Sequence, residues 1–299
     1  MRILVTGKNG QLGQSIYKIV NTGNGKNNYQ QDNEFIFVGR EELDLSSERS
    51  INHYLDKSNK FDVIINCAAY TAVDKAEEEQ DLANQVNHLA VKQLAGIAKE
   101  QKAKLIHIST DYVFDGESNK SYTETDKTNP INVYGKTKLA GEKALQEIMP
   151  TNAIIIRTSW MYSEFGNNFV STMLRLGKDR DEINVVSDQI GSPTYATDLA
   201  EVILRIIDNK NYQDKEQSTE IYHYSNLGEM SWYDFTKEIF KLAKIDCKVN
   251  PITTQRYPTP AKRPGNTSMN KDKILEKFRV EAYSWKKNFK NIIANNKEG

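Results

Sequence analysis

Three evenly spaced glycines follow the first predicted strand, and they constrain the fold more than any other feature of the sequence. Residues 2–6 are a short apolar run typical of a buried strand. Gly7, Gly10 and Gly13 come next, and apolar residues then recur at helical spacing over residues 12–20. This order predicts a dinucleotide-binding unit, because glycines let backbone N–H groups and a helix N-terminus approach a pyrophosphate. The spacing is not the commoner G-x-G-x-x-G, and a glycine turn that only packs helix on strand is the alternative.

Strands and helices then alternate through the first half of the chain. Further apolar runs that predict buried strands lie at residues 34–38, 61–66, 104–108 and 153–157. The segments between the later runs are helical in pattern, so we predict an α/β fold of the Rossmann type, with a doubly wound parallel sheet. The alternation breaks down beyond residue 162. We therefore expect a smaller C-terminal substrate-binding domain beside the NAD(P)-binding domain.

The domain boundaries and the later elements follow from the same reading. We predict an NAD(P)-binding Rossmann domain at 1–166 and 196–227, and a substrate domain at 167–195 and 228–299. Residues 21–33 are expected to form a surface loop, 83–98 to lie in one long helix, and 272–296 to close the chain as an amphipathic helix with a polar tail.

Composition narrows the class of protein. Lys+Arg and Asp+Glu both number 40, so a zero net charge gives no support for a nucleic-acid partner. No apolar stretch approaches membrane-span length, and Cys67 and Cys247 are too few for a disulfide framework or a metal site. The chain enters its glycine motif at once, which leaves no room for a signal peptide. We expect a soluble, cytoplasmic protein with no membrane partner and no resident metal.

The end of the second strand bears on the choice of cofactor. A dinucleotide fold often places an acidic residue here to accept the adenosine ribose hydroxyls. This chain has Gly39-Arg40 instead. Arg40 suits a 2′-phosphate, so NADPH is favoured and NADH stays possible; the alternative is an ordinary surface arginine. Asp44, followed by Leu45, either caps the next helix or touches the adenine edge, and the sequence leaves both open.

The ends of the third and fourth strands carry small and hydroxyl residues. Ala68, Ala69, Tyr70 and Thr71 follow the third strand, where small side chains let a flat ligand lie close; tight packing alone is the alternative. Ser109-Thr110-Asp111-Tyr112 follows the fourth strand. Reactive groups of such folds sit at the carboxyl ends of strands, and Thr110 is at one.

Tyr134 and Lys138 lie four residues apart at the start of the next predicted helix. Positions i and i+4 share a helix face, so we expect the lysine to lower the pKa of the phenol. Thr110 and Tyr134 can both hydrogen-bond a substrate carbonyl, with Tyr134 giving its proton as hydride reaches the carbon. Lys138 would hold the cofactor ribose. An exposed amphipathic face is the alternative for the pair.

Several longer segments carry a family resemblance. They are Thr6-Gly7-Lys8-Asn9-Gly10-Gln11-Leu12-Gly13, Asn66-Cys67-Ala68-Ala69-Tyr70-Thr71-Ala72-Val73-Asp74, Ser109-Thr110-Asp111-Tyr112-Val113-Phe114-Asp115-Gly116, Tyr134-Gly135-Lys136-Thr137-Lys138, Arg157-Thr158-Ser159-Trp160, Asp188-Gln189-Ile190-Gly191-Ser192-Pro193-Thr194 and Arg263-Pro264. With them the chain resembles the extended short-chain dehydrogenase/reductase family, and within it the dTDP-4-dehydrorhamnose reductases. The resemblance covers nearly the whole chain.

The resemblance implies a reaction and a set of roles. The reaction is reduction of the 4-keto group of dTDP-4-dehydro-L-rhamnose to dTDP-L-rhamnose, a precursor of surface polysaccharide. By position, the catalytic triad would be Thr110, Tyr134 and Lys138; cofactor contacts would include Asn9, Gln11 and Leu12; the sugar pocket would have Asp111, Tyr112 and Trp160; and the nucleotide-sugar side would have Gln189 and Arg263. A guanidinium fork at Arg263 suits phosphate oxygens, although a solvated loop charge is the alternative.

Two rival functions exist on the same fold. One is a sugar-nucleotide epimerase or dehydratase; dehydratase relatives carry an Asp-Glu pair after the strand-end threonine, whereas this chain has Asp111-Tyr112. The other is a non-catalytic regulatory subunit, like that of methionine adenosyltransferase, which the presence of Thr110, Tyr134 and Lys138 disfavours. A homodimer and a role for Mg²⁺ stay open.

Overall fold

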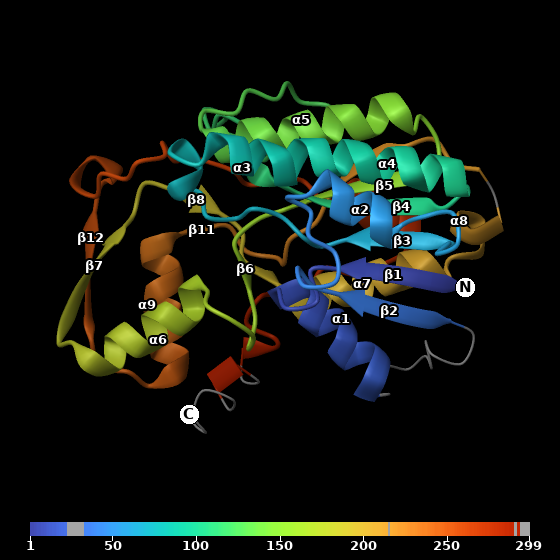
Figure 1. Cartoon of the computed structure of the whole chain (residues 1–299). Coiled ribbons are helices and arrows are strands. Elements are labelled where there is room, and N and C mark those ends of the chain that lie inside the picture. Colours follow the sequence, from blue (N-terminus) through green and yellow to red (C-terminus); the bar gives the residue numbers. More distant parts are fainter. Residues whose placement is uncertain (23–32, 215, 290–291, 294–299) are drawn as a thin grey trace.

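A central sheet of six parallel strands organises the computed structural model (Figure 1). The structure describes residues 1–22, 33–214, 216–289 and 292–293, and most of the predicted loop at 21–33 lies outside this part. In spatial order the strands are β10 (Glu220–His223), β5 (Ala153–Thr158), β4 (Lys104–Thr110), β3 (Val63–Asn66), β1 (Arg2–Thr6) and β2 (Glu34–Val38). The order reverses on either side of β1, as a doubly wound fold requires.

Helices cover both faces of this sheet. On one face lie α1 (Gln11–Thr22) and α7 (Ala196–Asp208); on the other lie α2 (Glu48–Tyr54), α4 (Ala90–Gln101) and α5 (Val133–Ile148). Side chains of β1 alternate between the two cores: Ile3 and Val5 pack toward α1 and α7, and Leu4 packs toward α4. Both faces are apolar, which is why the strands read as unbroken apolar runs. The predicted fold class is confirmed.

A second core lies beside the sheet, at the left of Figure 1. Its elements are α6 (Phe169–Asp179), α9 (Trp232–Ala243) and the parallel pair β7 (Glu182–Val186) and β12 (Lys248–Ile252). Aromatic rings dominate the interior, with Phe235 edge-to-face against Trp285 at 4.8 Å between centroids. A separate core supports a second domain, and the boundaries given above stay a prediction.

Short elements complete the path of the chain. They are β6 (Met161–Tyr162) paired with β9 (Thr194–Tyr195), β8 (Ile190–Gly191) paired with β11 (Met230–Ser231), the helices α3 (Gln80–Asn84), α8 (Lys210–Asp214) and α10 (Asp272–Phe278), and 3-10 turns at Lys75–Glu77, Asp111–Val113 and Thr254–Arg256. Within the described residues no helix is long and apolar enough to cross a membrane.

Two predicted helices differ from the structure. The closing helix predicted over 272–296 ends at Phe278, because Arg279 turns left-handed at φ +52° and the chain continues in irregular form through residue 288. The apolar residue Trp285 enters the second core from this irregular segment instead of forming a helix face. The helix predicted over 83–98 is broken by a π-helical turn at Gln85–Leu89.

Candidate active site

Two adjoining cavities lie at the carboxyl ends of the central strands. One, of about 580 Å³, contains Tyr134; the other, of about 490 Å³, contains Arg40. We call them the Tyr134 cavity and the Arg40 cavity. Of the predicted site residues, the Tyr134 cavity is lined by Gly7, Asn9, Gly10, Gln11, Leu12, Ala69, Thr71, Thr110, Asp111, Tyr134, Lys138 and Trp160. The Arg40 cavity is lined by Gly7, Asn9, Gly10, Arg40, Asp44, Leu45, Ala68, Ala69 and Tyr70.

The glycine turn joins the two cavities. Gly7 has φ +73°, and a Cβ on it would lie 2.9 Å from the backbone nitrogen of Ala68. A Cβ on Gly13 would lie 2.3 Å from the Gly7 carbonyl oxygen, so Gly13 allows α1 to start against β1 and does not reach either cavity. The first turn of α1 holds no acidic residue, which leaves its N-terminus suited to an anion.

Gln11 connects this turn to the second core. Its Oε1 accepts hydrogen bonds from Ser163 Oγ at 2.9 Å and Asn168 Nδ2 at 3.2 Å, and its Nε2 donates to the Met161 carbonyl at 3.4 Å. Asn168 also caps α6 through Ser171. The side-chain amide of Gln11 is therefore engaged by the protein, a role that its position in the glycine motif did not reveal.

The Arg40 cavity has an open rim. The Arg40 side chain is 75% exposed and its Nε lies 3.4 Å from Asp44 Oδ2. Asp44 does not cap the next helix; Ser47 does, while Asp44 Oδ1 accepts from the backbone N–H and hydroxyl of Ser46. Leu45 is buried behind them. Arg40 is thus free to turn toward a ligand at little cost, because exposed ion pairs contribute little.

Thr110 and Asp111 form a buried pair at the end of β4. The Thr110 hydroxyl donates to Asp111 Oδ1 at 2.9 Å and accepts from the Tyr112 N–H at 3.2 Å. Asp111 Oδ2 is buried without a hydrogen-bond partner in the described structure. Burial raises the pKa of Asp111 to about 6, although the hydrogen bond from Thr110 opposes the rise.

Tyr134 is held by the start of α5. Asn132 caps this helix by accepting from the Gly135 N–H at 2.8 Å. A Cβ on Gly135 would lie 2.1 Å from the Tyr112 carbonyl oxygen, so only glycine lets α5 begin this close to the end of β4. The rings of Tyr134 and Tyr112 meet edge to face at 5.8 Å. Tyr112 therefore supports Tyr134 without lining either cavity.

The expected effect of Lys138 on the pKa of Tyr134 is wrong for this structure. Burial raises the pKa of Tyr134 to about 12, and the hydrogen bond with Thr110 offsets this only in part. Lys138 is buried, and its ammonium group donates to the Ile108 carbonyl at 2.6 Å. Burial lowers the pKa of Lys138 to about 8, opposed by the charge of Glu142. Burial outweighs the charge pairing that the i, i+4 spacing predicted.

A buried ion pair lies behind Lys138. Arg157 of β5 and Glu142 of α5 are both at most 2% exposed, with Nη2 and Oε2 at 2.7 Å. Ser109 donates a short hydrogen bond to the same carboxylate, and the Arg157 guanidinium lies 5.2 Å from the Phe114 ring centroid. We did not predict this pair from the sequence. The one feature of the sequence that could have indicated the pair is the position of Glu142, one helical turn after Lys138.

The remaining predicted substrate residues lie in different places. Trp160 lines the Tyr134 cavity and stacks on Trp232 at 3.4 Å between centroids, with Gly191 leaving room for its ring. Arg263 pairs with Asp74 at 2.8 Å. Gln189 donates to the Thr254 hydroxyl at 3.1 Å. Neither Arg263 nor Gln189 lines the two cavities, and their contacts with substrate stay a prediction.

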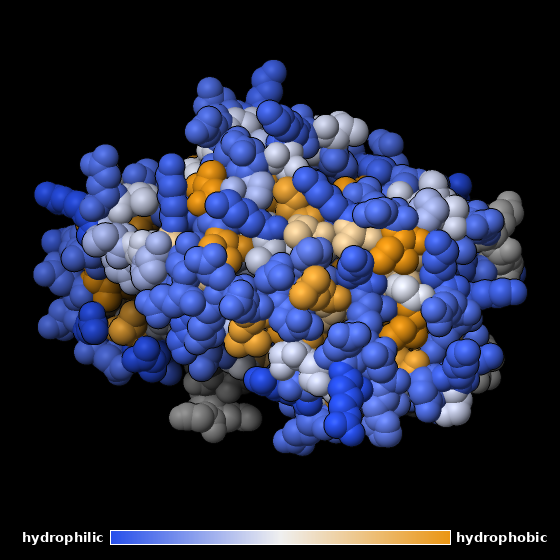
Figure 2. Space-filling model, turned by 45° about the horizontal axis from the view of Figure 1, so that its top comes forward, coloured by the Kyte–Doolittle hydropathy of each residue, from blue (hydrophilic) through white to orange (hydrophobic). Residues whose placement is uncertain are grey.

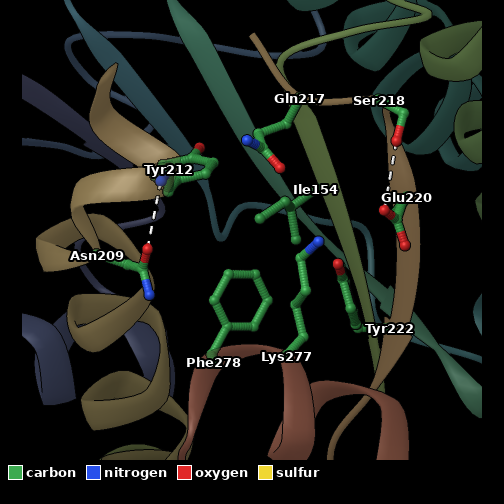
Figure 3. A pocket seen from close by; sticks show the side chains of 9 residues that line it. All are labelled: Ile154, Asn209, Tyr212, Gln217, Ser218, Glu220, Tyr222, Lys277 and Phe278. Atoms are coloured by element: carbon green, nitrogen blue, oxygen red, sulfur yellow. Dashed lines mark hydrogen bonds between the residues drawn. The ribbon is translucent and has the colours of Figure 1, made fainter. Parts of the chain in front are cut away.

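A third hollow, of about 330 Å³, lies at the opposite ends of the strands. Figure 3 shows Ile154, Tyr222 and Phe278 around it, near the amino ends of β5 and β10. Because ligands of open α/β sheets bind outside the carboxyl ends of strands, we do not assign this hollow to the reaction. In the described part of the chain no three His, Cys, Asp or Glu side chains gather as a metal site.

The Tyr134 cavity is lined both by a glycine turn of the nucleotide-binding type and by Thr110, Tyr134 and Lys138. On a doubly wound parallel sheet, this combination defines a reductase of the Rossmann-fold, short-chain dehydrogenase class. The family model of the RmlD substrate binding domain matches residues 1–298. A dTDP-4-dehydrorhamnose reductase of Aggregatibacter actinomycetemcomitans is 43% identical over 98% of each chain. The chain belongs to the dTDP-4-dehydrorhamnose reductase family.

Solved structures of family members agree with the fold. The dTDP-4-dehydrorhamnose reductase of Clostridium acetobutylicum superposes with a TM-score of 0.89 at 43% identity, covering 99% of this chain and 100% of that one. The reductase of Bacillus anthracis, solved in complex with NADP, gives 0.88 at 36% identity and 98% coverage of both chains.

Proposed function

We propose that the protein reduces the 4-keto group of dTDP-4-dehydro-L-rhamnose to dTDP-L-rhamnose with NADPH. The observation that carries this proposal is the meeting of Thr110, Tyr134 and Lys138 in one cavity that continues past the glycine turn into a second. Family membership supplies the substrate class. A bound nicotinamide would supply the hydride, and the protein must supply the proton.

Tyr134 is the proton donor in this proposal. A phenol with a pKa of about 12 is protonated at neutral pH, so it is ready to give a proton to the oxygen of the reduced carbonyl. Thr110 lies beside it and can hydrogen-bond the same oxygen after releasing Asp111. Lys138, with a pKa of about 8, can hold or return a proton near neutral pH. The cofactor side would be held by the glycine turn, with Ala68, Ala69, Tyr70 and Thr71 along its floor.

The cofactor preference is proposed from Arg40. Arg40 and Lys75 are exposed cations that line the Arg40 cavity, and the planar guanidinium of Arg40 suits a 2′-phosphate. The NADP complex of the Bacillus anthracis relative supports this choice. The cytoplasmic location stays a prediction from the sequence, and use of NADH, dependence on Mg²⁺ and a homodimer stay open.

The rival dehydratase reaction is disfavoured at Asp111. A dehydratase needs an added acid and base to remove and return protons beside the keto group. Tyr112 follows Asp111 where that pair would continue, and desolvation raises the pKa of its phenol above the usual value. A phenol of that kind is a poor base near neutral pH. Simple reduction needs one donor, and Tyr134 provides it.

The test is oxidation of NADPH on addition of enzymatically prepared dTDP-4-dehydro-L-rhamnose, with the product identified by NMR. We expect one NADPH consumed per dTDP-L-rhamnose formed. The absence of NADPH oxidation above background would refute the proposal. Consumption of dTDP-glucose without net NADPH oxidation would instead identify a dehydratase.

A further inference from the structure

A row of polar side chains crosses the sheet beneath the Tyr134 cavity. Thr6 of β1 pairs in register with Asn66 of β3, and Asn66 with His107 of β4. All three are at most 1% exposed, on the face where Leu4 and Leu105 belong to the apolar core. Three buried polar groups in an apolar layer are costly unless their hydrogen bonds are complete.

The hydrogen bonds of this row run in one direction. The backbone N–H of Ala68 can only donate, and it donates to Thr6 Oγ1 at 3.2 Å. The Thr6 hydroxyl then donates to Asn66 Oδ1 at 2.7 Å, the acceptor that the described structure provides for it. This places the Asn66 NH₂ against His107 Nδ1 at 3.1 Å. A rotated Asn66 amide would leave the Thr6 hydroxyl proton without that acceptor.

The direction of the row fixes the tautomer of His107. Burial and the charge of Lys138 hold the pKa of His107 well below its usual value, so its ring is neutral. Because Nδ1 accepts from Asn66, the ring proton lies on Nε2. His107 Nε2 is 3.4 Å from Lys138 Nζ, so an N–H donor faces the lysine nitrogen. Such a donor favours the amine form of lysine, whose lone pair can accept it.

Other ionisable groups surround Lys138. Glu142, one turn later in α5, favours the ammonium form, but its carboxylate is shared with Arg157 of β5. Tyr134 lies one turn earlier and is neutral at physiological pH. His107 is the neighbour on β4. The proton state of Lys138 therefore depends on its burial, which favours the amine, on the partly neutralised Glu142, which favours the ammonium form, and on the N–H donor of His107 that faces its nitrogen.

We propose that His107 is a positioning residue that donates its Nε2–H to the Lys138 amine and thereby sets the proton state of this lysine, with Asn66 and Thr6 fixing the histidine tautomer. The expected effect on the pH dependence of kcat/KM rests on the proposed reductase function. The assignment of the His107 tautomer does not, because it concerns only the row of hydrogen bonds within the sheet. Thr6, which begins that row, is the last residue of β1 and directly precedes Gly7, and Asn66 is its partner on β3.

The first measurement is the ring tautomer of His107 by long-range ¹H–¹⁵N NMR of the unliganded protein labelled with ¹⁵N-histidine. The four histidines are assigned by single substitutions. We expect a neutral ring with the proton on Nε2 that does not titrate between pH 6 and 9. A proton on Nδ1, or a charged ring, would overturn the proposal whether or not the protein reduces the sugar.

The second measurement is the pH dependence of kcat/KM for His107→Leu and His107→Gln. The alkaline limb of the pH profile is the pH range in which kcat/KM falls as the pH rises. Without the His107 donor, this limb should move upward by about one pH unit in His107→Leu, which corresponds to a tenfold change in the proton affinity of Lys138. Glutamine can accept from Asn66 and donate to Lys138, so His107→Gln should keep the wild-type limb. A lower kcat with an unmoved limb in His107→Leu would show a merely structural role and overturn the proposal.

His223→Leu is the matched control, because His223 is also fully buried in the central sheet but lies on β10. We expect its alkaline limb to stay at the wild-type position. If His107→Leu does not fold, His107→Gln and the tautomer measurement still decide the question. Absence of turnover in the wild-type protein would refute the reductase function and leave the tautomer result standing.

Discussion

The Tyr134 cavity and the Arg40 cavity differ in how their side chains are held. Around Tyr134 the neighbouring charged groups are buried and paired: Lys138 is 1% exposed and donates to the Ile108 carbonyl, and Arg157 and Glu142 form an ion pair inside the protein. Around Arg40 the decisive side chain is 75% exposed and has one long contact with Asp44. Figure 2 shows a face on which polar surface surrounds scattered apolar groups. In the proposed function, the chemistry would depend on groups that the fold holds in place, whereas cofactor preference would depend on one adaptable side chain.

The largest effect is expected from Tyr134→Phe. The substitution removes the proposed proton donor and keeps the ring that packs on Tyr112, so kcat should fall by about 10²–10⁴-fold with NADPH binding unchanged. Steady-state kinetics and a fluorescence titration with NADPH measure the two quantities. The control is Tyr257→Phe, at a phenol 58% exposed on the surface, which should match wild type. Near-normal kcat in Tyr134→Phe would remove Tyr134 as the acid.

The next effect tests the buried side of the comparison through stability. Arg157→Leu leaves the Glu142 carboxylate buried without its cation, so the free energy of unfolding should fall by about 3–5 kcal/mol. Urea denaturation measures the change. The matched control is Lys241→Leu, because Lys241 is 76% exposed and pairs with Glu238 at 3.9 Å. We expect less than about 1 kcal/mol there. Equal losses in both variants would contradict the contrast between buried and exposed groups.

A pH-dependent effect is expected at Asp111. Its pKa is raised to about 6 from an ordinary 3.8, so the folded protein binds a proton that the unfolded chain has released between these values. Stability from this group is complete below the unfolded pKa and is lost as pH rises through about 6. Asp111→Asn removes the titration, and its stability relative to wild type should increase from pH 4 to 7 by up to about 2 kcal/mol.

Thermal or urea unfolding at several pH values measures the Asp111 effect. Asp198 also has a pKa raised to about 6 by burial, but it is present in both proteins and cancels in the difference. A constant difference between Asp111→Asn and wild type across this range would show that Asp111 ionises normally in the folded protein.

The sequence predicted those features that local signals encode. The glycine turn and Thr110 at the end of β4 lie where expected, because each depends on a few neighbouring residues. The roles of the gathered site residues remain predictions. The fate of Trp285 was missed, because an apolar residue at helical spacing can equally enter a distant core.

The buried polar groups escaped prediction for a related reason. His107 meets Asn66 across two strands, 41 positions apart, and Arg157 meets Glu142 across the interface of β5 and α5. Such contacts depend on strand register and on which helix covers which face, and neither follows from local pattern. The pKa of Tyr134 was mispredicted likewise, because the i, i+4 spacing reports proximity to Lys138 but not burial.

The smallest effect is expected at the open rim. Arg40→Ala should raise the KM for NADPH about tenfold and leave the KM for NADH and kcat nearly unchanged, because the lost interaction is one charge-assisted contact in a solvent-exposed place. Stability should be unaltered, in contrast to Arg157→Leu. Lys60→Ala offers a control at an exposed cation outside both cavities. Equal effects of Arg40→Ala on both cofactors would refute the 2′-phosphate assignment, and a large fall in kcat would show that the two cavities are not energetically separate.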